Sequence, residues 1–257
     1  MTQEEMNILV PRKLKEIEEQ YHVTVLWAVE SGSRAWGFAS PDSDFDVRFI
    51  YKRKPEAYLK LNPDRDVIEL PIDETWDVCG WDLDKTLKLL QKSNPTLYEW
   101  IHSPIVYCDQ GFPQRIEKLL EEYFDEYKMM NHYLNMAKRQ IQDYLSGDSV
   151  IPKKYFYALR SILACMWIRT YHTAPPVLFE QLCQAILPQT MNHYVEYLLD
   201  LKIKSPEKVD IPPIHEVNEF LNEQVMEMNG YLENLTQKSH SCWDDLNQFF
   251  LTEIYQE

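Results

Sequence analysis

The sequence predicts an α+β protein in which a small mixed sheet is followed by an all-helical part. In the first 110 residues, short runs rich in β-branched and aromatic residues alternate with turn residues, which is typical of strands. From Pro113 onward the apolar residues recur at helical spacing, and proline and glycine separate the segments. We therefore expect two domains, residues 1–110 and residues 111–257.

The chain is expected to begin with a helix and a buried strand. Thr2 and Glu5 form a capping box, which predicts a helix through about Tyr21 that Pro11 kinks or splits. Residues 23–29 are almost entirely β-branched, aromatic or aliphatic, and this run predicts a strand with both faces buried.

Alternation of apolar and charged residues predicts the next strand, over residues 44–52. A short helical turn at 34–38 and a proline turn at 41–43 precede it. Because side chains alternate along a strand, one face carries the apolar positions and the other carries Asp44, Asp46 and Arg48.

Two further strands, two short helices and a last strand complete the predicted first domain. Residues 66–72 and 74–81 favour a hairpin through residues 73–74. Asp82 is a candidate cap for the helix that follows. The other expected elements are a short helix at 96–102 and a strand at 105–107.

The second half is expected to be entirely helical. Gly147 and several prolines separate its segments. The predicted helices span 113–146, 152–173, 177–187, 190–201, 213–236 and 241–256.

Charge and composition exclude several classes of function. The 257 residues carry 26 Lys and Arg against 41 Asp and Glu, so the net charge of −15 argues against a protein that coats duplex DNA or an anionic membrane. The six glycines form neither a dinucleotide fingerprint nor a P-loop. Five scattered cysteines without a C-x-x-C pair indicate reduced thiols and no zinc site. With no signal peptide and no long apolar stretch, we expect a soluble cytoplasmic protein.

The segment from residue 32 to residue 46 carries the chemistry. Asp44 and Asp46 project from one strand face, where two like charges raise each other's pKa and a hard divalent cation such as Mg²⁺ would remove the repulsion. Gly32 and Ser33 lie where a strand turns into a helix, and there backbone N–H groups and a hydroxyl can hold a phosphate. A phosphate cradle beside metal carboxylates is a layout for phosphoryl or nucleotidyl transfer.

This segment resembles the signature of the DNA polymerase beta-type nucleotidyltransferase superfamily. Gly32-Ser33 is followed by ten residues and then by Asp44-Phe45-Asp46, within the fuller pattern G-S-R-A-x-G and S-P-x-S-D-x-D. The resemblance implies an enzyme that moves a nucleoside monophosphate from an NTP to a hydroxyl acceptor and releases pyrophosphate. It also implies two Mg²⁺ ions, replaceable by Mn²⁺, and ATP as the favoured NTP.

That superfamily normally adds a third carboxylate from a neighbouring strand. Asp77 has the expected apolar flanks and is our choice, with Asp82 as the rival and Glu69 as a weaker option. Asp82 has a simpler interpretation as a helix N-cap. By the resemblance, Asp44, Asp46 and Asp77 would ligate the metals, and Asp77 would also accept the proton of the attacking hydroxyl.

A narrower resemblance extends over about residues 24–180. The matching strings are similar to the predicted nucleotidyltransferases of the YcgL/RlaP group, which is associated with RNA repair. The group implies the reaction class more strongly than the acceptor, so an RNA end, a protein and a small molecule all stay open. The strings are D-x-x-G-W-D-L-x-K from Asp77, K-S-N-P from Lys92, E-W from Glu99, S-P from Ser103 and K-Y-x-Y-x-L-R from Lys154.

Further residues are candidates for nucleotide binding. Ser33 would hydrogen-bond the terminal phosphates, a role compatible with capping a helix. Arg34 would reach the phosphates or form a surface salt bridge. In two-lobed nucleotidyltransferases a helix of the second domain closes one wall of the cleft, so Lys154 and Arg160 are candidate triphosphate ligands.

Two other functions remain open from the sequence. One is a non-catalytic nucleotide-binding or interaction module that kept the fold, although the complete carboxylate set favours an enzyme. The other is a partner-binding helical protein whose C-terminal half is the interface.

Overall fold

The computed structural model describes residues 1–40, 43–71, 76–204, 210–236 and 242–256, so the predicted turns at 41–42 and 73–74 lie outside the described residues. The chain divides into two compact units, each described here by itself. Unit 1 comprises Met1–Ala35, Asp44–Tyr123 and Ser239–Glu257, and unit 2 comprises Trp36–Ser43 and Phe124–Lys238. The assignment of residues 1–110 and 111–257 to separate domains stays a prediction.

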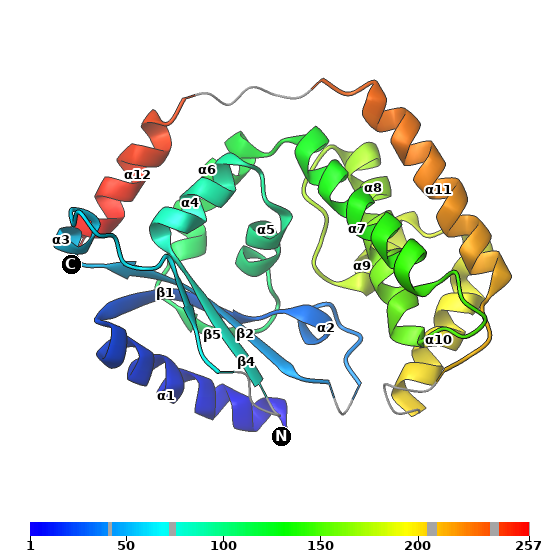
Figure 1. Ribbon diagram of the computed structural model, residues 1–257, viewed down its shortest axis with the longest axis horizontal. Coiled ribbons are helices and arrows are strands. Elements are labelled where there is room, and N and C mark those ends of the chain that lie inside the picture. The colour runs from blue at the N-terminus through cyan, green and yellow to red at the C-terminus, as the bar shows by residue number, and fades with distance from the viewer. Residues whose placement is uncertain (41–42, 72–75, 205–209, 237–241, 257) are drawn as a thin grey trace. The chain divides into compact units, whose positions relative to one another are not determined.

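Unit 1 is built on a five-stranded mixed sheet (Figure 1). Its strand order is β3-β4-β2-β1-β5, in which β2 and β4 run parallel and the other neighbours run antiparallel. The predicted α+β class is therefore confirmed. The strands are β1 (Val23–Glu30), β2 (Phe45–Arg53), β3 (Val67–Glu69), β4 (Trp76–Asp82) and β5 (Val106–Asp109).

The parallel register of β2 and β4 determines which acidic residues become neighbours. Asp46 pairs with Asp77 at the start of the two strands, whereas Tyr51 pairs with Asp82 at their end. Because a strand rises about 3.3 Å per residue, the five residue steps from Asp77 to Asp82 correspond to about 16 Å. The two candidates for the third carboxylate therefore lie at opposite ends of β4.

Helix α1 (Gln3–Tyr21) covers one face of the sheet (Figure 1). Its predicted capping box is present: the Glu5 amide donates to the Thr2 hydroxyl at 3.2 Å and the Thr2 amide donates to Glu5 Oε2 at 2.7 Å. Pro11 lies inside the helix without dividing it. The buried side chains of α1 meet alternate residues of the strands, and this core includes Met6, Val10, Leu14, Ile17, Phe45, Val47, Phe49 and Val78.

The remaining helices of unit 1 cover the opposite face of the sheet or flank it (Figure 1). Asp82 caps α4 by accepting from the Asp84 amide at 3.1 Å, as predicted. These helices are α2 (Gly32–Ala35), α3 (Pro55–Tyr58), α4 (Leu83–Gln91), α5 (Pro95–Ile101), α6 (Phe112–Tyr123) and α12 (Asp244–Tyr255).

The C-terminal helix α12 is held within unit 1 by polar contacts, most of which are partly buried. Arg115 of α6 makes a two-fold ion pair with Glu253, whose side chain is only 1% exposed. The Lys52 ammonium donates to the carbonyls of Glu253 and Gln256 at 2.8 and 2.6 Å, which caps the last turn of the helix.

The prediction of one helix over 113–146 is wrong. Helix α6 ends at Tyr123, and α7 begins at Glu126 behind Asp125, whose side chain accepts from the Lys128 amide at 3.0 Å. A buried N-cap carboxylate thus starts a new helix where the apolar spacing alone suggests continuity.

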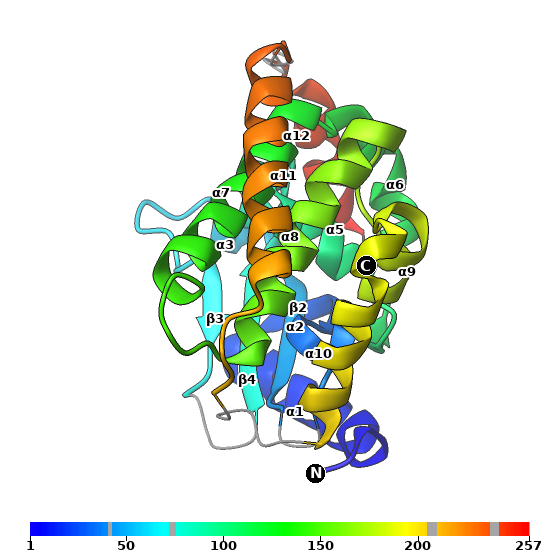
Figure 2. The ribbon, with the colours of Figure 1, turned by 90° about the vertical axis from the view of Figure 1, so that its right-hand side faces the viewer.

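Unit 2 is helical, and α7, α8 and α11 pack side by side (Figures 1 and 2). The segment Trp36–Ser43 belongs to it as well. The elements are α7 (Glu126–Tyr144), α8 (Pro152–Tyr171), α9 (Phe179–Ile186), η1 (Gln189–Met191), α10 (Asn192–Lys204) and α11 (His215–Glu233). Across the described part of the chain, no helix combines the length and apolar composition that a membrane crossing requires.

Aromatic rings hold the segment Trp36–Ser43 within unit 2. Phe38 stacks on Phe156 with ring centroids 4.9 Å apart and meets Phe179 edge-on at 5.4 Å. Trp36 meets Tyr157 edge-on at 5.3 Å, and its carbonyl accepts from the Phe179 amide at 2.9 Å. The stretch that joins Ser33 to Asp44 in the sequence is therefore well anchored within unit 2.

Candidate active site

Gly32 allows the end of β1 to pass close to Asp46. Gly32 has a left-handed φ of +60°, and a Cβ at this position would lie 2.2 Å from Asp46 Oδ2. Both the backbone conformation and the space require glycine here. The close approach brings the predicted Gly-Ser pair next to Asp46. The next residue, Ser33, is buried.

Asp46 and Asp77 converge on one guanidinium nitrogen. Arg48 Nη2 lies 2.9 Å from Asp46 Oδ1 and 2.7 Å from Asp77 Oδ2. Arg48 Nη1 also donates to the Asp77 carbonyl at 2.9 Å. Period-two alternation places Asp46 and Arg48 on one strand face, and the parallel register places Asp77 beside them.

This cluster is half-buried, so its charges are only partly screened. The side chains of Asp46, Asp77 and Arg48 are 32%, 34% and 16% exposed. Two carboxylates this close would repel each other, and the shared Arg48 charge offsets that repulsion. The sequence places Arg48 on the acidic face, yet it does not predict that its charge bridges the two carboxylates.

Asp44 lies just before β2 and is exposed. Arg34 Nε donates to the Asp44 carbonyl at 3.1 Å, and the Arg34 guanidinium lies 3.6 Å from the ring centroid of Phe45. Arg34 of α2 is thus placed beside Asp44.

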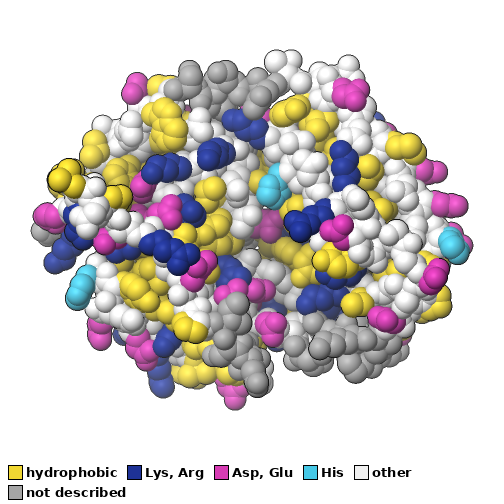
Figure 3. All heavy atoms as spheres, viewed as in Figure 1, with side chains coloured by type: hydrophobic (Ala, Val, Ile, Leu, Met, Phe, Trp, Pro, Cys, Tyr) yellow, Lys and Arg dark blue, Asp and Glu magenta, His cyan; other side chains and the backbone are white. Residues whose placement is uncertain are grey.

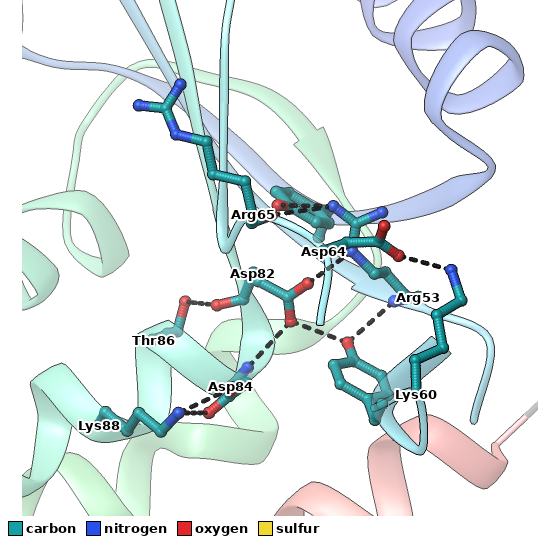
Figure 4. Close-up of polar contacts among 10 residues, drawn as sticks. Arg53, Lys60, Asp64, Arg65, Asp82, Asp84, Thr86 and Lys88 are labelled. Carbon is teal, nitrogen blue, oxygen red and sulfur yellow. Dashed lines mark hydrogen bonds and ion pairs between the residues drawn. The ribbon is translucent and has the colours of Figure 1, made fainter. Parts of the chain in front are cut away.

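Asp82 is occupied at the other end of β4 (Figure 4). Its Oδ2 lies 3.0 Å from Arg53 Nε, and its Oδ1 accepts from the Tyr58 hydroxyl at 2.8 Å. Burial raises the pKa of this carboxyl above its ordinary range, although the hydrogen bonds and Arg53 oppose that shift. These contacts give Asp82 a structural role. The weaker candidate, Glu69 of β3, forms an ion pair with Arg65, which precedes that strand.

The two candidate cations of the helical half lie in unit 2. Lys154 Nζ is 3.6 Å from the ring centroid of Tyr144, and the buried Arg160 guanidinium is 4.3 Å from the ring centroid of Trp36. Both sit on α8. Their part in nucleotide binding stays a prediction.

Glu30 is a member of this region that the sequence analysis missed. The residue is fully buried at the end of β1, and its Oε1 accepts from the Asp46 amide at 2.6 Å. Burial raises the pKa of Glu30 to about 7, against the opposing effect of its hydrogen bonds. A carboxylate that closes an otherwise apolar strand, two residues before a Gly-Ser pair, is a signal that could have identified it.

The carboxylate oxygens of this region are the type of ligand that a hard divalent cation binds, and two of the three predicted metal ligands, Asp46 and Asp77, converge. Within the described residues, no three His, Cys, Asp or Glu side chains are gathered closely enough to hold a metal. Two carboxylates, however, already converge on one positive group, and carboxylate oxygens are the ligands that Mg²⁺ prefers. The Arg48 guanidinium occupies the position of a cation between Asp46 and Asp77.

Comparison with known proteins supports the predicted resemblance. A family model described as RlaP, RNA repair pathway DNA polymerase beta family, matches residues 6–252. A protein of Bacillus subtilis (strain 168), named uncharacterized protein YcgL, is 42% identical over 245 residues, which covers 94% of each chain. Both matches fall on the group that the motifs predicted.

Proposed function

The chain belongs to the RNA repair pathway DNA polymerase beta family, and on that premise we propose that it is a metal-dependent nucleotidyltransferase. In the proposed reaction a hydroxyl oxygen of the acceptor attacks the α-phosphorus of an NTP. The bond from that phosphorus to the bridging oxygen of the β-phosphate breaks, and pyrophosphate leaves. The proton of the attacking hydroxyl passes to a carboxylate of the site.

One observation carries this proposal. Asp46 and Asp77 are aligned on neighbouring parallel strands, and their carboxylates converge on a single cationic nitrogen beside the Gly32 backbone. Among the described acidic residues considered from the sequence, Asp82 and Glu69 are engaged elsewhere. Asp77 is therefore the third carboxylate that the geometry favours.

Asp44, Asp46 and Asp77 would hold the metal, with Mg²⁺ expected and Mn²⁺ as a substitute. Bound there, two such ions supply charge stabilisation and a lower pKa for the attacking hydroxyl. Asp77 is the expected proton acceptor because its side chain is one-third exposed and therefore accessible from solvent.

The NTP phosphates are expected at the Gly-Ser turn. The Ser33 hydroxyl would donate to a terminal phosphate oxygen, next to Gly32, whose missing side chain makes room for the Asp46 carboxylate. Arg34 supplies positive charge next to Asp44. Lys154 and Arg160 are proposed as further phosphate ligands, and ATP is the proposed NTP.

An RNA end is the acceptor that the family description supports. On the face seen in Figure 3, basic and acidic side chains lie interspersed, in keeping with the net charge of −15. Such a surface favours recognition of a short RNA end over a long electrostatic track along duplex DNA. The alternative acceptors are a protein hydroxyl and a small-molecule hydroxyl, and a transfer assay that offers all three acceptors distinguishes them from an RNA end.

The test is transfer of α-labelled NTPs to RNA ends, protein and small hydroxyl compounds in the presence of Mg²⁺. Asp77→Asn should lower transfer by about 100-fold or more, because the variant loses a metal ligand and the proton acceptor. Asp66→Asn is the matched control: Asp66 is also a partly exposed aspartate in an ion pair, at 3.3 Å from Lys85. Equal loss in both variants would contradict the assignment of the site.

A non-catalytic nucleotide-binding module is the second candidate. The observation in its favour is that Arg48 is already ion-paired with both Asp46 and Asp77. Calorimetry separates the two functions, because an enzyme of this type binds NTP more tightly with Mg²⁺, whereas a module that relies on Arg48 binds NTP equally with and without Mg²⁺.

A further inference from the structure

A buried chain of hydrogen bonds runs from α1 to the backbone of Asp46. Gln3 Nε2 donates to the Tyr107 hydroxyl at 3.1 Å, and that hydroxyl donates to Glu30 Oε2 at 2.5 Å. Glu30 Oε1 in turn accepts from the Asp46 amide at 2.6 Å. Glu30 and Tyr107 are 0% and 8% exposed, so the bond between them is shielded from water, and the bonds to Gln3 and to the Asp46 amide are partly buried.

The end of β1 therefore holds both main-chain polar groups of Asp46, its N–H and its C=O. The Ser31 amide donates to the Asp46 carbonyl at 2.9 Å, while the Glu30 carboxyl takes the Asp46 amide. Glu30 is itself fixed, because its carbonyl accepts from the Ser103 hydroxyl at 2.6 Å. Each of these contacts restrains the backbone from which the Asp46 carboxylate projects.

Burial of the Glu30 carboxyl group costs free energy that an apolar side chain at the same position would not. An apolar residue at the end of an apolar strand would fill the same space without desolvating a carboxyl group. The hydrogen bonds of Glu30 offset that cost and are directed at the backbone of a proposed metal ligand. The Asp46 side chain is thus restrained by Glu30 from the amide and by Arg48 from the carboxylate.

We infer that Glu30 is a positioning residue, which sets the direction of the Asp46 carboxylate for metal binding through the Asp46 amide. The inference rests on the proposed function for the identity of what Asp46 binds. Glu30 itself touches neither substrate nor metal, since its carboxyl group is enclosed by Tyr107 and the Asp46 amide.

The first experiment measures the bond without using activity. In ¹⁵N-resolved spectra, hydrogen exchange of the Asp46 amide should become about 10- to 100-fold faster in Glu30→Ala, the factor expected for losing a hydrogen bond to an ionisable group. Glu30→Gln keeps a carbonyl oxygen at the same place, so exchange should stay near the wild-type rate. Unchanged exchange in folded Glu30→Ala would overturn the inference.

The second experiment measures the consequence. Calorimetric titration with Mn²⁺ should show metal affinity about 10- to 100-fold weaker in Glu30→Ala, a range typical for residues that orient a metal ligand. Glu30→Gln should restore most of the affinity. In transfer assays kcat should fall in Glu30→Ala while the KM for NTP changes little, because the phosphates are held elsewhere.

Tyr107→Phe tests the same chain when Glu30→Ala fails to fold. The variant removes the hydroxyl that holds Glu30, so it should weaken Mn²⁺ binding by a smaller factor than Glu30→Ala. Tyr51→Phe is the matched control, because Tyr51 is also a buried tyrosine but lies toward the other end of β2 from Asp46. Equal effects of the two variants would overturn the inference.

The outcomes separate this inference from the proposed function. If the wild-type protein binds no Mn²⁺ or Mg²⁺, the proposed function fails. If the wild type binds metal and folded Glu30→Ala binds it equally well, the proposed function stands and the role of Glu30 is refuted.

Discussion

Arg48 and Asp77 are joined side chain to side chain at 2.7 Å across the parallel pair β2 and β4. The same guanidinium nitrogen reaches Asp46 at 2.9 Å. The contact exists because Arg48 is two residues after Asp46 on one strand and Asp46 is in register with Asp77 on the next. One positive charge thereby offsets the repulsion between two negative ones, and the group of three side chains keeps a net negative charge.

The first prediction concerns competition between Arg48 and metal. Arg48→Gln should bind Mg²⁺ about 3- to 10-fold more tightly, because the ion no longer displaces a resident positive charge. The metal-free variant should be less stable than the wild type, and Mg²⁺ should raise its Tm by a larger amount. Calorimetry and thermal unfolding check both effects. Weaker Mg²⁺ binding in Arg48→Gln would instead make Arg48 part of the support for the metal ligands.

The second prediction concerns the turn before α2. Gly32→Ala should abolish most metal-dependent transfer, because its Cβ would displace the Asp46 carboxylate and strain a φ of +60°. Gly111→Ala is the control with a similar φ of +71°, and its Cβ meets only flexible side-chain ends. Both should lose about 1–2 kcal/mol of unfolding free energy. Activity retained in Gly32→Ala at wild-type level would contradict the close approach.

The third prediction is the pH dependence of the Asp82 contribution to stability. Because burial raises the pKa of Asp82 in the folded state, the folded protein binds this proton more tightly than the unfolded chain. The contribution of the Asp82 proton to the free energy of unfolding is therefore complete below the pKa that Asp82 has in the unfolded chain. It declines as pH rises through the pKa that Asp82 has in the folded protein. Urea unfolding should show a larger stability deficit of Asp82→Asn near pH 4 than near pH 7. A stability deficit of Asp82→Asn that grows as pH rises would contradict a raised pKa of Asp82 in the folded state.

The fourth prediction concerns the attachment of α12. Arg115→Ala should lower the unfolding free energy by about 3 kcal/mol, because it leaves the buried Glu253 carboxylate without its partner. Combining Arg115→Met with Glu253→Met should recover most of that loss, since the unpaired charge is then absent. Denaturant titration of the single and double variants measures the difference. A double variant as unstable as Arg115→Ala would refute this explanation.

Local sequence patterns predicted most of the elements correctly. The capping box at Thr2 and Glu5, the alternation of β2 and the Asp82 cap all depend on neighbours within a few residues. These interactions are encoded where they act, so periodicity and capping chemistry were sufficient. The break before α7 was missed because the apolar spacing continues across it, and the N-cap bond from the Lys128 amide to the Asp125 side chain leaves that spacing unchanged.

The residues of the candidate site also fall into two groups, those that a local motif predicts and those that only tertiary contacts reveal. Gly32, Ser33, Asp44 and Asp46 are close in the sequence, and their motif identified them directly. Arg48 and Glu30 were not assigned to the site, because their contacts depend on the pairing of β2 with β4 and on the burial of the end of β1. Those pairings join residues that are far apart in the sequence.

The sequence by itself determined the mixed α+β composition, the Gly-Ser and Asp-x-Asp pattern and the resemblance that defines the family. Only the tertiary structure decided between Asp77 and Asp82 as the neighbour of Asp46. Both aspartates lie on β4, and no property of that strand alone distinguishes them. The register against β2 places Asp77 beside Asp46 and sends Asp82 to Arg53 and Tyr58, about 16 Å along the strand.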